Sequence, residues 1–138
     1  MMRSAMMALS LLAACGGHAA STGAGARSPL QDDLVAYATA SCFTMQQNNY
    51  LKDQGQRWAG AIMQGAHGPI EKWVPVTTAV KAELARSGVA EGQGEGPMAP
   101  AVTLPVMTCG RIATTSGVRQ AIGAAVTALA NDYAVKSR

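Results

Sequence analysis

Apolar residues recur every three or four positions through most of the chain after residue 27, a spacing that places them on one face of an α-helix. No segment shows the strict alternation of apolar and polar residues that is typical of a half-buried strand. The pattern therefore predicts an all-α domain over residues 28–138, built as a small bundle of four to five helices. The helices are expected at about residues 29–48, 52–66, 75–86 and 103–114, and from residue 116 to about residue 133.

The first helix has the clearest start. Ser28 is a suitable N-cap, Pro29 takes the first helical position, and Gln31 is placed to complete a capping box. Asp32 and Asp33 would then lie in the first turn, where the helix dipole favours negative charge. These signals predict that the helix begins directly after Ser28.

The second helix has a narrow apolar face formed by Trp58, Ile62 and Met63, and it contains Gly55 and Gly60. A glycine inside a helix costs about 0.5–1 kcal/mol relative to alanine, unless close packing requires the missing side chain. Both glycines are therefore expected to weaken this helix.

The N-terminus carries the pattern of a secretory signal. Arg3 precedes an apolar stretch too short to span a bilayer, and Leu12-Ala13-Ala14-Cys15 matches a bacterial lipobox. We expect cleavage after residue 14, a lipid on Cys15, and a flexible tether over residues 15–27. Gly16 is not the aspartate that signals inner-membrane retention, so the expected location is the outer membrane, facing the periplasm. The alternative is cleavage at the same place without lipidation.

Charge and composition exclude several classes of function. The formal net charge of +3 and the lack of a basic run argue against nucleic-acid binding. His67 is the only histidine outside the signal and tether, and no motif places it beside a nucleophile or other metal ligands. The carboxylates of Asp53 and Asp132 have no second carboxylate placed to cooperate with them. We therefore expect a binding protein without a metal or a cofactor, rather than an enzyme.

Two cysteines remain after Cys15, in the first and fourth predicted helices. Because the periplasm is oxidising, Cys42 and Cys109 are expected to form a disulfide. The alternative is a pair of reduced cysteines buried in a helical core. In the fourth helix the residues expected to face inward are Leu104, Cys109, Ile112 and either Met107 or Val106.

Residues 88–101 form the longest stretch without helical pattern. Loops of this length in compact domains tend to be functional or disordered. The glycines at positions 92, 94 and 96 do not form a phosphate-binding loop, because no lysine follows them and no strand is expected before them. The composition of this stretch predicts a long, flexible loop.

Several short segments together resemble the type VI secretion amidase immunity protein family. They are Tyr37 with Ser41-Cys42, Asp53-Gln54-Gly55, Glu71-Lys72-Trp73, and the run from Leu104 to Cys109. The resemblance covers roughly residues 30–122. It implies a small periplasmic helical protein, forming a homodimer, that blocks the active-site cleft of a cysteine amidase, a toxin that cuts peptidoglycan stem peptides.

The resemblance implies that Cys42 and Cys109 match the family's structural cysteines. The 88–101 loop is suited to plugging a cleft by its own length and composition. Its expected partner-binding residues are Glu91, Gln93, Glu95 and Met98. The alternative function is that of a structural or assembly lipoprotein of the bacterial envelope, with the same fold but no toxin partner.

Overall fold

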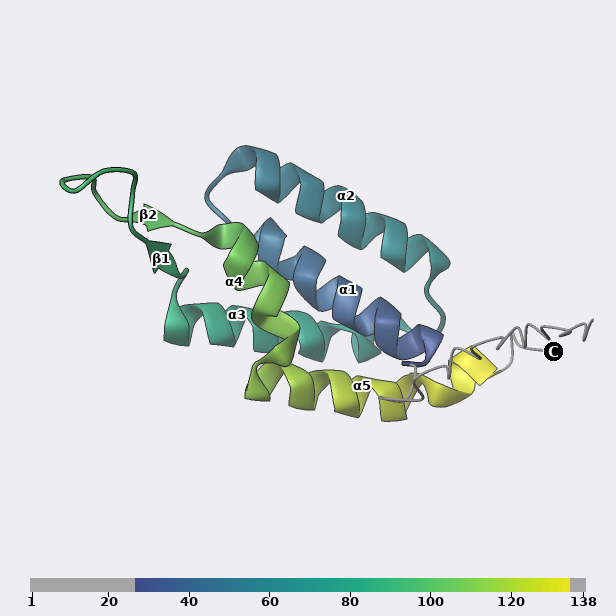
Figure 1. The fold of residues 1–138 in the computed structure, drawn as a ribbon. Helices are drawn as coiled ribbons and strands as arrows, with labels where there is room; N and C mark the ends of the chain where they lie inside the picture. Colours follow the sequence, from purple (N-terminus) through teal and green to yellow (C-terminus); the bar gives the residue numbers. More distant parts are fainter. Residues whose placement is uncertain (1–26, 135–138) are drawn as a thin grey trace, which may run out of the picture.

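The computed structural model describes residues 27–134 and confirms the all-α fold with one disulfide. The expected signal peptide, Cys15 and the tether up to residue 26 lie outside the described residues. The five α-helices are α1 Pro29–Thr44, α2 Asn49–Gly65, α3 Val74–Ser87, α4 Pro105–Arg111 and α5 Ser116–Ala134 (Figure 1). Two short 3-10 turns, η1 Ile70–Lys72 and η2 Ile112–Thr114, precede α3 and α5.

The helix α1 is the centre of the bundle. It contacts each of the other four α-helices, while α3 and α5 also pack on each other (Figure 1). Its buried residues lie on more than one face, because neighbours surround it: Leu30, Leu34, Ala38, Ala40, Ser41 and Cys42. A helix surrounded in this way needs no polar face. Its start agrees with the sequence, since the Ser28 hydroxyl accepts a hydrogen bond from the Gln31 backbone N–H at 3.2 Å.

The core is filled by apolar side chains from α1, α3 and α5 together with Trp73, which lies between η1 and α3. Trp73 has no exposed surface, and its ring meets that of Tyr37 edge to face at 5.4 Å between centroids. The other large side chains that are fully buried are Leu34, Val76, Val80, Val118 and Leu129. Burial of this apolar surface is the main force that holds the bundle together.

The helix α2 packs on α1 through Gly55, the only buried residue of α2. A Cβ at Gly55 would lie 2.6 Å from the Thr44 backbone nitrogen and 2.8 Å from the Ala40 carbonyl oxygen. Close packing therefore requires this glycine, so the exception to the weakening effect of a helical glycine applies at Gly55. Gly60 faces open space, with nothing within 4 Å of an added Cβ.

The disulfide joins α1 to α4. Cys42 and Cys109 are bonded, and neither has exposed surface, which excludes the alternative of two reduced cysteines. The side-chain amide of Gln46 donates to the Cys42 carbonyl at 3.0 Å and lies 3.4 Å from the Cys109 Sγ. The disulfide thus ties a short peripheral helix to the central one.

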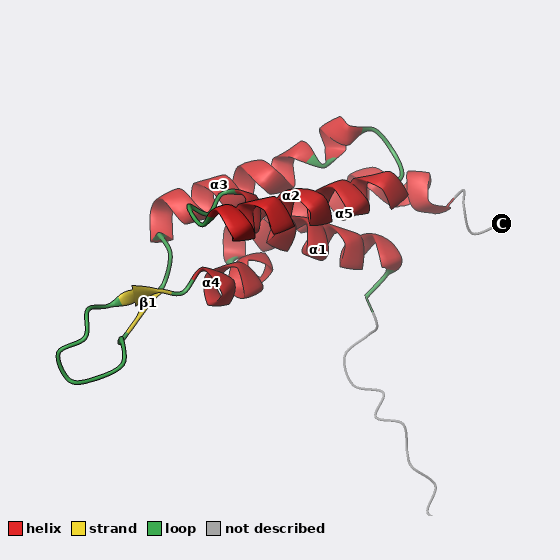
Figure 2. Cartoon of the chain, turned by 90° about the horizontal axis from the view of Figure 1, so that it is seen from above, coloured by secondary structure: helices red, strands yellow, loops and turns green. Residues whose placement is uncertain are grey.

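Two short strands lie where no strand was expected. β1 Glu91–Gly92 pairs antiparallel with β2 Val102–Thr103, within and just beyond the stretch predicted to be a flexible loop. We call residues 88–104 the hairpin arm. It projects from one end of the bundle, between α3 and α4 (Figures 1 and 2).

Candidate binding site on the hairpin arm

The base of the hairpin arm is fixed by backbone pairing and by one side chain of α4. The Leu104 N–H donates to the Ala90 carbonyl at 2.7 Å, next to the β1–β2 pairing. The Ala90 N–H donates to the Thr108 hydroxyl at 2.9 Å, and that hydroxyl donates in turn to the Leu104 carbonyl. The arm therefore has a defined base, and the expectation that this whole stretch has no strand is wrong.

The glycines of the arm are explained by close approach of its two sides. A Cβ at Gly94 would lie 2.5 Å from the Pro100 carbonyl oxygen, and one at Gly92 would lie 2.9 Å from the Leu104 Cδ1. Gly96 has a φ of 98°, a left-handed conformation that glycine adopts without steric cost. Their spacing reflects the geometry of a narrow hairpin.

The arm and α4 carry much of the exposed apolar surface. Met98 is 93% exposed, and Val102, Val106 and Met107 follow it along the chain with 39–60% exposure. We call these four residues the apolar strip. The remaining large apolar side chains that are exposed in residues 27–134 are Tyr50, Trp58, Ile70 and Val74 on α2 and around η1.

The helix α4 shows why the sequence missed part of this strip. Met107 or Val106 was expected to face inward, but both are exposed, and Cys109 is the only buried residue of α4. Since α4 packs mainly on α1 and η2, one narrow side of it is covered. An apolar pattern alone does not show how many neighbours a helix has.

All four predicted partner-binding residues lie on the arm, with different surroundings. Glu91, Glu95 and Met98 are exposed, and neither carboxylate has an ion-pair partner in the described part of the chain. The side-chain amide of Gln93 donates to the Ala99 carbonyl at 3.3 Å. Gln93 therefore helps to shape the arm, while the other three are available for contacts.

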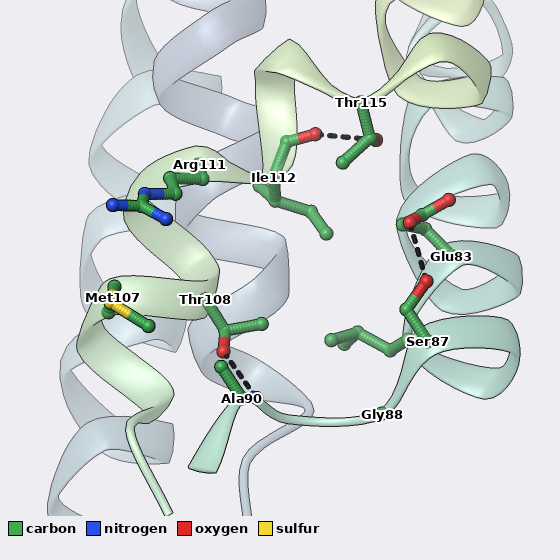
Figure 3. Close-up of a pocket in the computed structure, with 10 residues that line it drawn as sticks. Glu83, Ser87, Gly88, Ala90, Met107, Thr108, Arg111, Ile112 and Thr115 are labelled. Atoms are coloured by element: carbon green, nitrogen blue, oxygen red, sulfur yellow. Dashed lines mark hydrogen bonds between the residues drawn. The ribbon is translucent and has the colours of Figure 1, made fainter. Parts of the chain in front are cut away.

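A cavity of about 210 Å³ lies where the arm meets the bundle, between the end of α3 and α4 (Figure 3). Ile112 and Leu84 supply apolar surface, and Thr108 and Ser87 supply hydroxyl groups. Arg111 borders the cavity, and its side chain extends to the opposite side of α4 (Figure 3). The cavity has the size of a single side chain rather than of a metabolite.

The carboxylate beside this cavity belongs to Glu83. Hydrogen bonds from Arg86 at 2.6 Å and from Ser87 at 2.9 Å lower the pKa of Glu83 below its ordinary value. Glu83 is thus an ionised, hydrogen-bonded group whose partners lie on its own helix. This arrangement stabilises the last turns of α3 and is poorly suited to proton transfer near neutral pH.

A second group of polar side chains lies at the opposite end of the bundle, beside a cavity of about 580 Å³. The Tyr133 hydroxyl donates to the Asp33 carboxylate at 2.8 Å, and the His67 ring packs edge to face on the Tyr133 ring. Burial and the Asp33 hydrogen bond raise the pKa of Tyr133 to about 12. His67 thus packs against α5, and the tyrosine stays protonated at neutral pH.

The two carboxylates that the sequence analysis considered for acid–base chemistry, those of Asp53 and Asp132, each form an ion pair. Asp53 accepts from Arg57 at 2.8 Å, and Asp132 accepts from Lys72 at 2.9 Å. Over residues 27–134, no group of three or more metal-ligating side chains comes together. Nor does any helix in that range combine the length and apolarity needed to cross a membrane.

Comparisons with protein-family models, with curated proteins and with solved structures gave no match for this chain.

Proposed function

We propose that this chain is a lipid-anchored periplasmic immunity protein, which blocks a peptidoglycan-cleaving amidase effector of the type VI secretion system. The observation that carries the proposal is the hairpin arm, which projects from the bundle and holds Met98 at 93% exposure. In this proposal the arm enters the amidase cleft and excludes the peptidoglycan substrate.

The construction of the arm supports a role in binding. Its base is held by the Leu104–Ala90 and Ala90–Thr108 hydrogen bonds before any partner arrives. A preorganised element loses less conformational entropy on binding than a flexible loop. Met98 at the arm and Met107 on α4 are unbranched, adaptable side chains that suit an apolar protein surface.

The charge of the arm narrows the kind of cleft that it fits. Residues 88–104 contain Glu91 and Glu95 but no lysine or arginine. The arm is therefore acidic, and the complementary cleft would have a basic rim around an apolar floor. Such complementarity raises the association rate and makes it fall with salt.

The expected location supports the same partner. A signal peptide ending before Cys15 would export the chain, and a lipid on that cysteine would hold it at the membrane facing the periplasm. Peptidoglycan lies in that compartment, so a toxin that cleaves it would meet the anchored protein there.

The test is capture and inhibition of the amidase. The full chain with Cys15→Ser is used as bait in periplasmic extract of a neighbouring strain, and captured protein is assayed for peptidoglycan digestion with and without the chain. We expect a small cysteine amidase, inhibited at a one-to-one ratio. Recovery of envelope-assembly proteins alone would overturn the proposal and favour the structural lipoprotein.

Matched variants test the surface. Met98→Asp and Val106→Asp place a charge on the apolar strip and are expected to weaken inhibition at least tenfold. Tyr50→Asp is the control, because Tyr50 is 71% exposed and lies at the start of α2, outside the strip. Equal inhibition by all three variants would place the amidase contact on another face.

A further inference from the structure

The helix α4 is a weakly attached element that carries the arm. It has seven residues, too few for a helix that is stable on its own. Its only buried side chain is that of Cys109, and the next buried residue along the chain is Ile112 in η2. The disulfide to Cys42 is therefore the main attachment of α4 to the central helix.

The arm is attached to α4 by direct hydrogen bonds. Thr108, the residue before Cys109, accepts the Ala90 N–H through its hydroxyl. The Thr108 N–H donates to the Leu104 carbonyl at 3.0 Å, and the Leu104 N–H pairs with Ala90. A displacement of α4 would thus pull on both sides of the arm at its base.

The other side of the disulfide lies in the central helix of the bundle. Cys42 lies in α1, which contacts every other α-helix of the bundle. Gln46, one turn further on, is buried and directs its amide at the Cys42 carbonyl and the Cys109 Sγ. The disulfide is the covalent link between α1 and α4, in addition to their packing contacts.

We infer that the Cys42–Cys109 disulfide positions the hairpin arm, so that oxidation of the two thiols converts the arm into its binding-competent form. In this step the two thiols lose two protons and two electrons by thiol–disulfide exchange. A disulfide of an oxidoreductase takes up those protons and electrons and is released as two thiols. The reduced chain keeps the bundle but holds the arm loosely.

Burial of the two sulfur atoms makes the oxidation effectively irreversible in the folded chain. Neither cysteine has exposed surface once the bond has formed, so a reductant cannot reach the sulfurs without opening the fold. Oxidation therefore acts as a single maturation event in the oxidising compartment, rather than as a reversible switch. For its effect on inhibition this inference rests on the proposed function, whereas the order of the arm is measurable without a partner.

Amide hydrogen exchange tests the inference directly. The full chain with Cys15→Ser is compared with the same chain carrying Cys42→Ala and Cys109→Ala. The Ala90, Leu104 and Thr108 amides report the arm and its attachment, and the Val80 and Ile122 amides report the bundle. Relative to the bundle amides, we expect the three arm amides to exchange at least tenfold faster after removal of the disulfide.

Two further variants separate local from global effects. Leu129→Ala removes a fully buried side chain from α5 without touching α4, and should accelerate arm and bundle amides together. Thr108→Val keeps the disulfide and removes the hydroxyl, and should accelerate mainly the Ala90 amide. If the cysteine-free chain shows the uniform pattern of Leu129→Ala, or if Thr108→Val leaves the arm protected, the inference is overturned.

Inhibition assays distinguish this inference from the proposed function. In one case, the intact chain captures no amidase, while removal of the disulfide still causes a selective loss of protection in the arm. That result would overturn the proposed function and support the positioning role of the disulfide. In the opposite case, the cysteine-free chain folds, inhibits the amidase as well as the intact chain does, and keeps its arm amides protected. That result would overturn the positioning role of the disulfide and would support the proposed function.

Discussion

The helical bundle and the hairpin arm are held in place by different interactions. In the bundle, Leu34, Trp73 and Leu129 have no exposed surface, and apolar burial carries the stability. None of residues 88–104 reaches that degree of burial, and the arm is fixed by hydrogen bonds at its base. The contrast implies that the order of the arm and the stability of the bundle can be changed separately.

The largest effect should come from the bundle. Leu34→Ala removes a side chain with no exposure from the central helix, and is expected to lower the free energy of unfolding by about 3–5 kcal/mol. Met98→Ala, on the arm, is the matched truncation and should change it by less than about 0.5 kcal/mol. Urea unfolding of both variants measures the difference. Similar losses in the two would show that the arm is part of the core.

The contact between α1 and α2 offers a sharper version of the same test. Gly55→Ala pushes a methyl group against the Thr44 backbone nitrogen, and should cost about 1–3 kcal/mol through overpacking. Gly60→Ala adds the same methyl group to open space and should stabilise α2 by roughly 0.5–1 kcal/mol. Thermal unfolding of the Gly55→Ala and Gly60→Ala variants measures the two changes in stability. Two variants that change stability in the same direction would contradict this account of the α1–α2 contact.

The two regions also differ in how far the sequence predicted them. Helical spacing correctly predicted the helices of the bundle, and the Ser28 cap marked the start of the first one. Periodicity succeeds there because burial on one side of a helix leaves a repeating pattern. It gave no sign that Gly55 is a packing contact, because the need for a glycine depends on the distance to another helix.

In the arm, the sequence identified the segment but not its form. Strands of two residues, such as β1 and β2, are too short to leave an alternating pattern. The composition of this stretch predicts a flexible loop and does not show that Gly92 and Gly94 each face an atom of the opposite side of the hairpin. The acidic and apolar residues of the arm were found from composition, whereas the exposure of Val106 required knowledge of what covers α4.

The end of the bundle opposite the arm provides a pH-dependent contribution. In the folded chain the pKa of Tyr133 is raised to about 12, mainly by burial and then by the hydrogen bond to Asp33. An unfolded tyrosine ionises near pH 10, so this contribution is complete below pH 10 and is lost as the pH rises towards about 12. Tyr133→Phe should cost about 1 kcal/mol at pH 7, and this difference should shrink above pH 10.

Urea unfolding at pH 7, 9 and 11 checks the Tyr133 contribution. Tyr37 and Tyr50 are present in both proteins, so their ionisation cancels in the difference between the wild-type chain and Tyr133→Phe. Parallel stability curves over this range would show that the Asp33–Tyr133 hydrogen bond contributes no pH dependence. The exchange of the arm amides should be the same in both proteins at pH 7. Tyr133 is in the last turn of α5, and this end of α5 lies at the end of the bundle opposite the arm (Figure 1).

The smallest effect on stability, with the largest effect on the arm, is expected at Gly94. A Cβ there would lie 2.5 Å from the Pro100 carbonyl oxygen, so Gly94→Ala must open the hairpin beyond β1 and β2. Because this segment buries little apolar surface, the free energy of unfolding should change by less than about 0.5 kcal/mol.

Gly110→Ala on α4 is the control, since its added Cβ meets nothing within 4 Å. If the arm presents the binding surface, Gly94→Ala should lose inhibition while Gly110→Ala keeps it, and unfolding curves will show that both bundles are intact. A Gly94→Ala chain that still inhibits fully would mean that the conformation of the arm beyond its base does not matter for binding.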